Sequence, residues 1–310
     1  MTQLDTANGT PLSRLTFGTM QFGGNADAMA SRAMFDAAFD AGINHFDTAV
    51  GYTGGQSETL LGPMVAEKRD AIYLATKVAY KGGAGRANIL GHFATCQRQL
   101  QLDTVDLLYL HRFDDDTPLE ETFATMAELQ QKGRIRHIGV SNYAAWQVMK
   151  AQAICATLGT KIDVIQPMYS LVKRQSEVEI FPMSVDQGIK IVPYSPLGGG
   201  LLTGKYAAGE TGRLTDDAMY KKRYSVDWMH ECAKALSDIA AELGTHPATL
   251  AVAWAAKHAA NPSPIISARS LEQLVPSLAA EGFAMDTALY DRITALSVSP
   301  APATDRLEEA

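Results

Sequence analysis

Four polar residues of this sequence have the types that carbonyl chemistry requires. Asp47, Lys77 and His111 each lie at the end of a strand-like run of four to six residues, and Tyr52 lies five residues after Asp47. In a parallel α/β barrel the carboxyl ends of the strands open onto one face. We therefore expect the three strand-end side chains to converge in space, with Tyr52 on a loop above them.

Together, these residue types could reduce a carbonyl group. A phenol has a pKa near 10 and is a poor acid by itself. A nearby ammonium group, Lys77, is expected to lower the Tyr52 pKa by about 1 to 3 pH units, and Asp47 would keep that ammonium charged and in place. A neutral His111 could donate a hydrogen bond to the carbonyl oxygen. Tyr52 would then act as the proton donor.

Each of these residues has a simpler explanation when it is considered alone. A lone Asp at a strand end commonly caps a helix, a lone Lys is solvated, and a lone Tyr or His is a satisfied polar group. Their joint appearance at strand ends favours catalysis. The remaining histidines lack such support, and we expect them to be structural or exposed: His45, His92, His137, His230, His246 and His258.

Composition excludes several classes of protein. A net charge of −7 over 310 residues argues against a nucleic-acid-binding face, which would be basic. Three separated cysteines without a C-x-x-C motif predict reduced thiols and a cytoplasmic location. The sequence has no apolar run of 18 residues and no signal-peptide pattern, so we expect no membrane segment.

Two motifs could be mistaken for ligand sites. Residues 199–205 read G-x-x-x-x-G-K, but Tyr206 replaces the Ser or Thr that a P-loop needs for magnesium. Residues 114–116 are three consecutive aspartates, which we interpret as a solvated loop beside the substrate mouth. We predict no metal site.

The spacing of strand and helix patterns predicts one (β/α)8 TIM barrel, forming a single domain over residues 1–310. Successive strand ends are separated by 26 to 34 residues, the length of one strand–helix unit. The expected strand ends are Gly18, Asp47, Lys77, His111, Ser141, Pro167 and Ser195, and the eighth strand is expected at Pro264–Ile266. Helices are expected at 29–41, 58–66, 86–101, 119–131, 144–158, 178–187, 227–243, 247–258, 271–279 and 287–296.

The two chain ends add to this barrel. The pair Asn8-Gly9 predicts an N-terminal β-hairpin within residues 4–18 that would plug the bottom of the barrel. Helices beyond the eight repeats are expected near the C-terminus, followed by a flexible tail over residues 297–310.

Several longer motifs carry a resemblance to a known family. HFDTAVGY, GGQSETLLG, ATK, LLYLHR, GRIRHIGVSNY, IQPMYS and VPYSPLGGGLLTGKY occur in this order between about Leu15 and Ala279. This set resembles the aldo-keto reductase superfamily. The resemblance implies that Tyr52 is the general acid/base, that Lys77 and Asp47 tune it, that His111 orients the carbonyl, and that a nicotinamide cofactor supplies hydride.

The resemblance also implies a set of cofactor contacts. Ser141, Asn142 and Gln166 resemble the residues that bind the nicotinamide carboxamide, and Tyr194 resembles the ring that stacks on the nicotinamide. We expect residues 198–202, within a long loop 197–224, to fold over the pyrophosphate. Further cofactor contacts are expected from Ser195, Leu197, Gly199, Leu201, Ser267, Arg269 and Gln273.

The expected cofactor is NADPH, with NADH as a second candidate. Arg269 is the best candidate for binding a ribose 2′-phosphate, because guanidinium groups match phosphate geometry. The sequence departs from the family at Ser267, where Gly or Lys is common, and at Pro276 and Ser277, where the family has an acidic residue and Asn. These departures place the adenine contacts in question.

The expected substrate is a small carbonyl compound. Loops over the catalytic face should shape its pocket with Met20, Phe22, Tyr80, Arg112 and Phe113. Arg112 indicates either tolerance of anionic substrates or pairing with the nearby aspartates.

Three functions are compatible with these observations. The first is an NADPH-dependent reductase of an aldehyde or ketone, which could also run in reverse as a sugar or alcohol dehydrogenase. The second is a nicotinamide-binding, redox-sensing regulatory subunit with little turnover, and the third is a structural barrel without a ligand. The motifs do not specify an oligomeric state.

Overall fold

Eight parallel strands form the centre of the protein in the computed structural model, which describes residues 4–206, 209, 211–306 and 308. Neighbouring strands pair in the order β7-β6-β5-β4-β3-β2-β1-β8. Ser263 N donates to Ile191 O at 2.9 Å and Ile265 N to Pro193 O at 2.8 Å, so hydrogen bonds also join the two outermost strands. The expected (β/α)8 barrel is confirmed.

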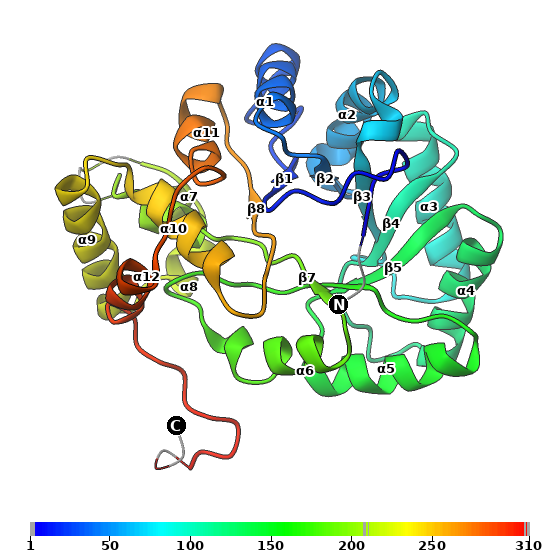
Figure 1. The fold of residues 1–310 in the computed structure, drawn as a ribbon. Helices are drawn as coiled ribbons and strands as arrows, with labels where there is room; N and C mark the ends of the chain where they lie inside the picture. Colours follow the sequence, from blue (N-terminus) through cyan, green and yellow to red (C-terminus); the bar gives the residue numbers. More distant parts are fainter. Residues whose placement is uncertain (1–3, 207–208, 210, 307, 309–310) are drawn as a thin grey trace.

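The strands are short, and helices cover their outer side (Figure 1). The strands are β1 Thr16–Gly18, β2 His45–Asp47, β3 Tyr73–Val78, β4 Val105–Leu110, β5 Ile135–Ser141, β6 Val164–Gln166, β7 Lys190–Ile191 and β8 Ile265–Ile266. The helices that follow strands are α1 Ala28–Asp40, α2 Gln56–Ala66, α3 Arg86–Leu100, α4 Leu119–Gln131, α5 Ala145–Thr157, α6 Ile180–Asp186 and α11 Leu271–Leu278. The additional helices are α7 Arg213–Asp216, α8 Ala218–Arg223, α9 Asp227–Glu242, α10 Pro247–Lys257 and α12 Thr287–Thr294.

Most strand ends agree with the sequence prediction to within one residue, but the seventh does not. Strand β7 ends at Ile191, four residues before the expected Ser195. Pro193 has no amide hydrogen and cannot donate to a ladder. After Pro193, the β6 and β7 segments pair again at one isolated parallel bridge, between Met168 and Tyr194.

Alternating residues of the strands face the barrel interior and the surrounding helices. The interior holds Tyr73 and Ala75 from β3 and Leu107 and Tyr109 from β4, which are all buried. Lys77 and His111 continue these two alternating series at the carboxyl end. The side-chain period of the strands therefore directs the expected catalytic residues toward the barrel axis.

The expected N-terminal hairpin is present in a short form. Asp5 and Pro11 form one antiparallel bridge around the turn at Asn8 and Gly9, where Gly9 has a φ of 84°. Leu4 is 5% exposed and packs against the interior side chains of the barrel. The hairpin therefore plugs the amino end of the barrel.

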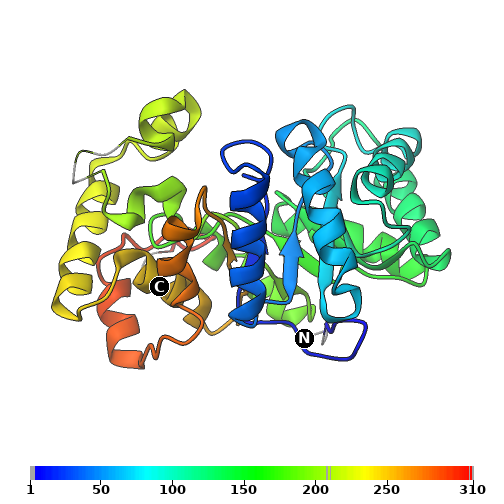
Figure 2. The same ribbon diagram turned by 90° about the horizontal axis from the view of Figure 1, so that it is seen from above.

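The connection between β7 and β8 contains more structure than a long loop. Residues Gly198–Thr203 form a 3-10 helix, and α7 and α8 follow within the segment expected to be irregular. Asp217 caps α8 by accepting a hydrogen bond from Met219 N at 2.8 Å. Figure 2 shows α7 and α8 at the end of the barrel opposite the N-terminus.

The final helix packs on the outside of the barrel against α10. Trp254 of α10 donates from Nε1 to Thr294 Oγ1 at 2.8 Å and stacks on Tyr290. Part of the tail, residues 307 and 309–310, lies outside the described residues, and its flexibility stays a prediction. None of the helices in the described part of the chain is long and apolar enough to cross a membrane.

Candidate active site

Lys77 lies at the centre of a buried polar cluster at the carboxyl ends of β2 and β3. Its side chain is fully buried and forms an ion pair with Asp47, and Nζ also donates to Thr48 O at 2.8 Å. The register of the two strands pairs Asp47 with Ala75, so Lys77 lies two residues further along the same face. Burial lowers the Lys77 pKa, but Asp47 and Tyr52 outweigh this effect and raise the pKa overall. The ammonium therefore stays charged.

Tyr52 begins the 3-10 helix Tyr52–Gly55, which follows β2. Its hydroxyl accepts a hydrogen bond from Lys77 Nζ at 3.4 Å. Burial raises the pKa of Tyr52, and the opposing effect of Lys77 does not cancel this. The expected net lowering of the Tyr52 pKa is therefore wrong. In this state of the site Tyr52 holds its proton at neutral pH, which is the form that a proton donor needs.

His111 lies beside Tyr52 in an edge-to-face arrangement. The two ring centroids are 5.8 Å apart at an interplanar angle of 81°. Burial, and then the charge of Lys77, lower the pKa of His111 to about 3. The imidazole is therefore neutral at neutral pH and keeps one ring N–H that can donate a hydrogen bond.

The four residues expected at the nicotinamide form one hydrogen-bonded group. Ser141 Oγ donates to Gln166 O at 2.9 Å, and Asn142 Nδ2 donates to Ser141 Oγ at 3.1 Å. Tyr194 Oη donates to Asn142 Oδ1 at 2.7 Å. Gln166 Nε2 donates to Asp47 Oδ2 at 2.9 Å. This group is thus directly connected to the Asp47–Lys77 ion pair.

Tyr80 and Arg112, expected at the substrate pocket, lie at the mouth of the same face. The Tyr80 ring centroid is 4.9 Å from that of His111, and Arg112 Cζ lies 5.6 Å from the Tyr80 ring centroid. Arg112 makes no ion pair with the aspartates among the described residues. Its charge still lowers the Asp114 pKa, after the larger effects of Thr117 and the Ala84 amide.

The other expected pocket residues are divided between the mouth and the core. Phe113 packs edge-to-face against Tyr143, with ring centroids 5.1 Å apart. Met20 is partly exposed in the turn after β1. Phe22 is 1% exposed and packs against Phe17 in the core, so its ring is not available to line a pocket. The short turn after β1 directs the Phe22 side chain inward.

The aspartate triplet does more than face solvent. Asp114 Oδ2 accepts hydrogen bonds from Ala84 N at 2.7 Å and from Thr117 Oγ1 at 2.5 Å. These bonds join the loop after β3 to the loop after β4. Asp115 and Asp116 are exposed, as the sequence predicted.

Comparison with known proteins is consistent with this geometry. The model of the Aldo/keto reductase family matches residues 14–298. The chain belongs to this family.

Similar relatives cover most of the chain. The uncharacterized oxidoreductase YrpG of Bacillus subtilis (strain 168) is 32% identical over an alignment of 303 positions that covers 90% of each protein. Human aflatoxin B1 aldehyde reductase member 2 is 33% identical, covering 85% of this chain and 80% of its own length. A probable voltage-gated potassium channel subunit beta of Oryza sativa subsp. japonica is 32% identical over 88% of each protein.

Family membership establishes the class of reaction. Aldo/keto reductases act on small carbonyl compounds with a nicotinamide cofactor, and the protein is an NAD(P)H-dependent oxidoreductase. Among the described residues, Ser267 Oγ is buried at the end of β8 without a hydrogen-bond partner. The hydroxyl and amide side chains near Asp47 suit a carboxamide that both donates and accepts. The residues present therefore fit a nicotinamide cofactor.

The remaining residues expected at the cofactor of this aldo/keto reductase follow β7 and β8. Ser195 and Gly199 have φ angles of 62° and 68°, and Leu197 precedes the 3-10 helix Gly198–Thr203. Leu201 is 2% exposed and packs in the core, so its side chain is not available to contact a ligand. Arg269 is partly exposed before α11, and Gln273 is exposed within that helix.

Sequence reasoning missed two residues near the site. Trp146, at the start of α5, is 62% exposed and lies against Phe113 with ring centroids 6.1 Å apart. Tyr109 places its ring 5.7 Å from Lys77 Nζ. Tyr109 could have been found, because it precedes His111 by two residues and so faces the same side of the strand. Trp146 has no such signal.

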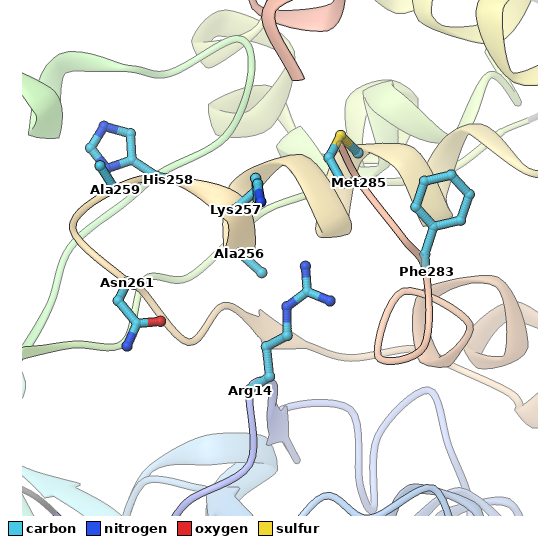
Figure 3. Close-up of a pocket in the computed structure, with 8 residues that line it drawn as sticks. All are labelled: Arg14, Ala256, Lys257, His258, Ala259, Asn261, Phe283 and Met285. Atoms are coloured by element: carbon cyan, nitrogen blue, oxygen red, sulfur yellow. The ribbon is translucent and has the colours of Figure 1, made fainter. Parts of the chain in front are cut away.

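A separate surface cavity of about 490 Å³ lies at the opposite, amino end of the barrel between residues near β1, α10 and α11 (Figure 3). Arg14 points into it, while its guanidinium donates to Ala280 O at 3.1 Å. A weaker bond reaches Ala253 O at 3.5 Å. Arg14 thus ties the C-terminal part of the chain to the barrel, and none of the residues of the Lys77 cluster lines this cavity.

Proposed function

We propose that the protein reduces an aldehyde or ketone to an alcohol with NADPH, using Tyr52 as the general acid. The observation that carries the proposal is the contact of Lys77 Nζ with both Asp47 and the Tyr52 hydroxyl. A neutral His111 beside Tyr52 supports it further. The substrate class is an aldehyde or ketone, including one derived from a sugar.

The proposed mechanism assigns one task to each residue. Ser141, Asn142 and Gln166 would hold a reduced nicotinamide, which would supply the hydride for the carbonyl carbon. The N–H of neutral His111 donates a hydrogen bond to the carbonyl oxygen and orients it. Tyr52 passes its hydroxyl proton to that oxygen as negative charge develops, and Lys77 stabilises the phenolate that remains. Asp47 holds Lys77 in place, and the burial of this cluster strengthens each of these interactions.

Turnover with a defective proton donor tests this proposal. NADPH oxidation would be followed by absorbance with aromatic aldehydes, aldoses, dicarbonyls and anionic sugars. Tyr52→Phe should lower kcat by about 10²- to 10⁴-fold, because general acid catalysis contributes that much. Cofactor affinity should change little. A Tyr52→Phe variant that is as active as the wild type would refute the assignment.

The preference for NADPH rests on Arg269. Arg269 is partly exposed beside the N-terminus of α11 and makes no hydrogen bond or ion pair within the described part of the chain. A guanidinium at this position suits a 2′-phosphate, and the positive end of the helix dipole would add to it. Arg269→Ala should raise KM for NADPH and leave KM for NADH nearly unchanged. An equal effect on both cofactors would remove this assignment.

A nicotinamide-binding regulatory subunit with little turnover is the second candidate. The likeness to a relative named as a potassium channel subunit beta favours it. It would be preferred if NADPH binds tightly while no carbonyl in the panel is turned over. For either function we propose that the chain acts as one domain, because a continuous set of buried side chains extends from Leu15 to Ile293.

A further inference from the structure

The loop between β3 and α3 begins immediately after the catalytic lysine and contains an unusual backbone position. Ala79 lies two residues after Lys77 and has a φ of 63°, in the left-handed region that favours glycine. Its side chain is 1% exposed, so the residue is held inside the protein. A buried alanine in this conformation is strained and persists only where its surroundings enforce it.

One side chain outside the site holds this conformation. Ala79 N donates a hydrogen bond to Nδ1 of His92 at 3.2 Å. His92 belongs to α3 and is partly exposed. Because Nδ1 accepts, the ring proton of a neutral His92 is on Nε2. Without this acceptor, the amide of Ala79 would lose its partner within the protein.

The strained residue determines where its neighbour lies. Tyr80 follows Ala79 directly, and its ring centroid is 4.9 Å from that of His111. Tyr80 is 52% exposed, so few packing contacts fix its ring, and Arg112 covers it at 5.6 Å. The ring forms a wall beside the group that is proposed to orient the substrate carbonyl.

We propose that His92 is a positioning residue for substrate recognition. By accepting the Ala79 amide, it fixes the turn that places Tyr80 against His111, and Tyr80 then selects substrates with a planar or aromatic group next to the carbonyl. This inference rests on the proposed function, because it uses His111 as the carbonyl-orienting group. The far part of the loop has its own anchor, since Asn88 Nδ2 donates to Lys81 O at 2.8 Å and to Gly83 O at 2.6 Å.

The first test compares two replacements of His92 that differ in one acceptor. His92→Leu removes the acceptor, whereas His92→Asn offers a carbonyl oxygen near the position of Nδ1. Losing the partner of a buried amide should raise KM for 4-nitrobenzaldehyde by about tenfold in His92→Leu. KM for propanal, kcat and the Kd of NADPH should change by less than about threefold. His92→Asn should restore most of the loss.

A second test uses the strain itself. Glycine adopts a positive φ without strain, so Ala79→Gly should keep the turn even without His92. The effect of His92→Leu on KM should therefore be smaller in the Ala79→Gly background. It should also be smaller in Tyr80→Ala, because the ring that His92 positions is then absent.

These outcomes separate the inference from the proposed function. If His92→Leu lowers kcat for both aldehydes equally, or if His92→Asn behaves like His92→Leu, the positioning role is refuted. If the wild type shows no turnover, the proposed function fails. Calorimetric binding of 4-nitrobenzyl alcohol to the NADP⁺-loaded protein then tests His92. Weaker binding in His92→Leu with recovery in His92→Asn supports the positioning role, and equal binding in all three proteins overturns it.

Discussion

The two ends of the barrel both contain buried carboxylates, but they use them differently. At the amino end, Asp106 forms ion pairs with Arg69 at 2.7 Å and Arg136 at 3.0 Å and accepts from Leu74 N at 2.8 Å. At the carboxyl end, Asp47 holds a single lysine, and that lysine reaches a hydroxyl with its remaining donor at 3.4 Å.

The two clusters differ in whether the groups around the carboxylate keep hydrogen-bond donors that a ligand could use. The Asp106 carboxylate accepts from a backbone amide and from two guanidinium groups of neighbouring segments, which is typical of a stabilising site. The Asp47 cluster ends in Tyr52 and His111, whose O–H and N–H can still donate to a ligand. Similar charged residues therefore tie strands together at one end of the barrel, whereas at the other end they leave donors free for the proposed reaction.

Replacing one lysine at each end of the barrel should give the largest difference in kcat between two variants. Lys77→Met should lower kcat by about 10²- to 10⁴-fold, because Tyr52 loses the charge that stabilises its phenolate. Lys161→Met removes the partner of Asp163 at the amino end, 3.6 Å away, and should leave kcat within about twofold of the wild type. Steady-state NADPH oxidation measures both. Equal losses in the two variants would contradict the division between the ends.

Asp106→Ala should affect stability and leave catalysis unchanged. Removing this carboxylate leaves the Leu74 amide without its partner, and Arg69 and Arg136 lose an ion pair that solvent partly replaces. We expect the free energy of unfolding to fall by about 2 to 3 kcal/mol, measured by urea denaturation. The matched kcat at 25 °C should be unchanged. A large fall in kcat with normal stability would mean that the amino end takes part in the reaction.

A buried histidine at each end of the barrel makes the free energy of unfolding depend on pH, and single variants can separate the two contributions. Burial lowers the pKa of His45, in the amino half of the barrel, and of His111 to about 3. The unfolded chain takes up protons near pH 6.5. The stability that each of these two histidines contributes is therefore complete above about pH 6.5 and falls toward pH 3, by up to about 1.4 kcal/mol per pH unit.

Denaturation curves between pH 7 and pH 4 measure this slope. His45→Gln and His111→Gln should each remove part of it, and His111→Gln alone should impair turnover. An unchanged slope in both variants would show that these histidines are not the groups that titrate.

Replacing Asp114 is expected to have the smallest effect and tests the comparison directly. Asp114 lies at the carboxyl end of the barrel, but like Asp106 at the amino end it accepts hydrogen bonds from a backbone amide and a side chain. It accepts from the Ala84 amide and the Thr117 hydroxyl and joins two loops. Asp114→Asn should cost about 1 kcal/mol of stability, measured by thermal unfolding, with kcat unchanged. A change in kcat without loss of stability would place Asp114 among the reacting groups.

The sequence predicted the repeated strand–helix units and the features that follow from a local sequence pattern. Helix α4 begins at Leu119 and ends at Gln131 as expected, because its amphipathic pattern is regular. Asp47 and Lys77 meet as expected, since parallel strands align their carboxyl ends. The rest depends on three-dimensional surroundings. Phe22 turns into the core, and burial, which no motif reports, reverses the expected direction of the Tyr52 pKa.

The way in which the barrel closes has a consequence for its synthesis. Strand β8 pairs with β1, so Thr16 meets Ile265, and the amides of Ser263 and Ile265 donate the closing hydrogen bonds to carbonyl oxygens at the end of β7. The contacts between β1 and β8 join residues from nearly opposite ends of the chain, which makes their formation slow. A nascent chain emerging from the ribosome must therefore expose unpaired edges at β1 and β7 until the segment after α10 has appeared.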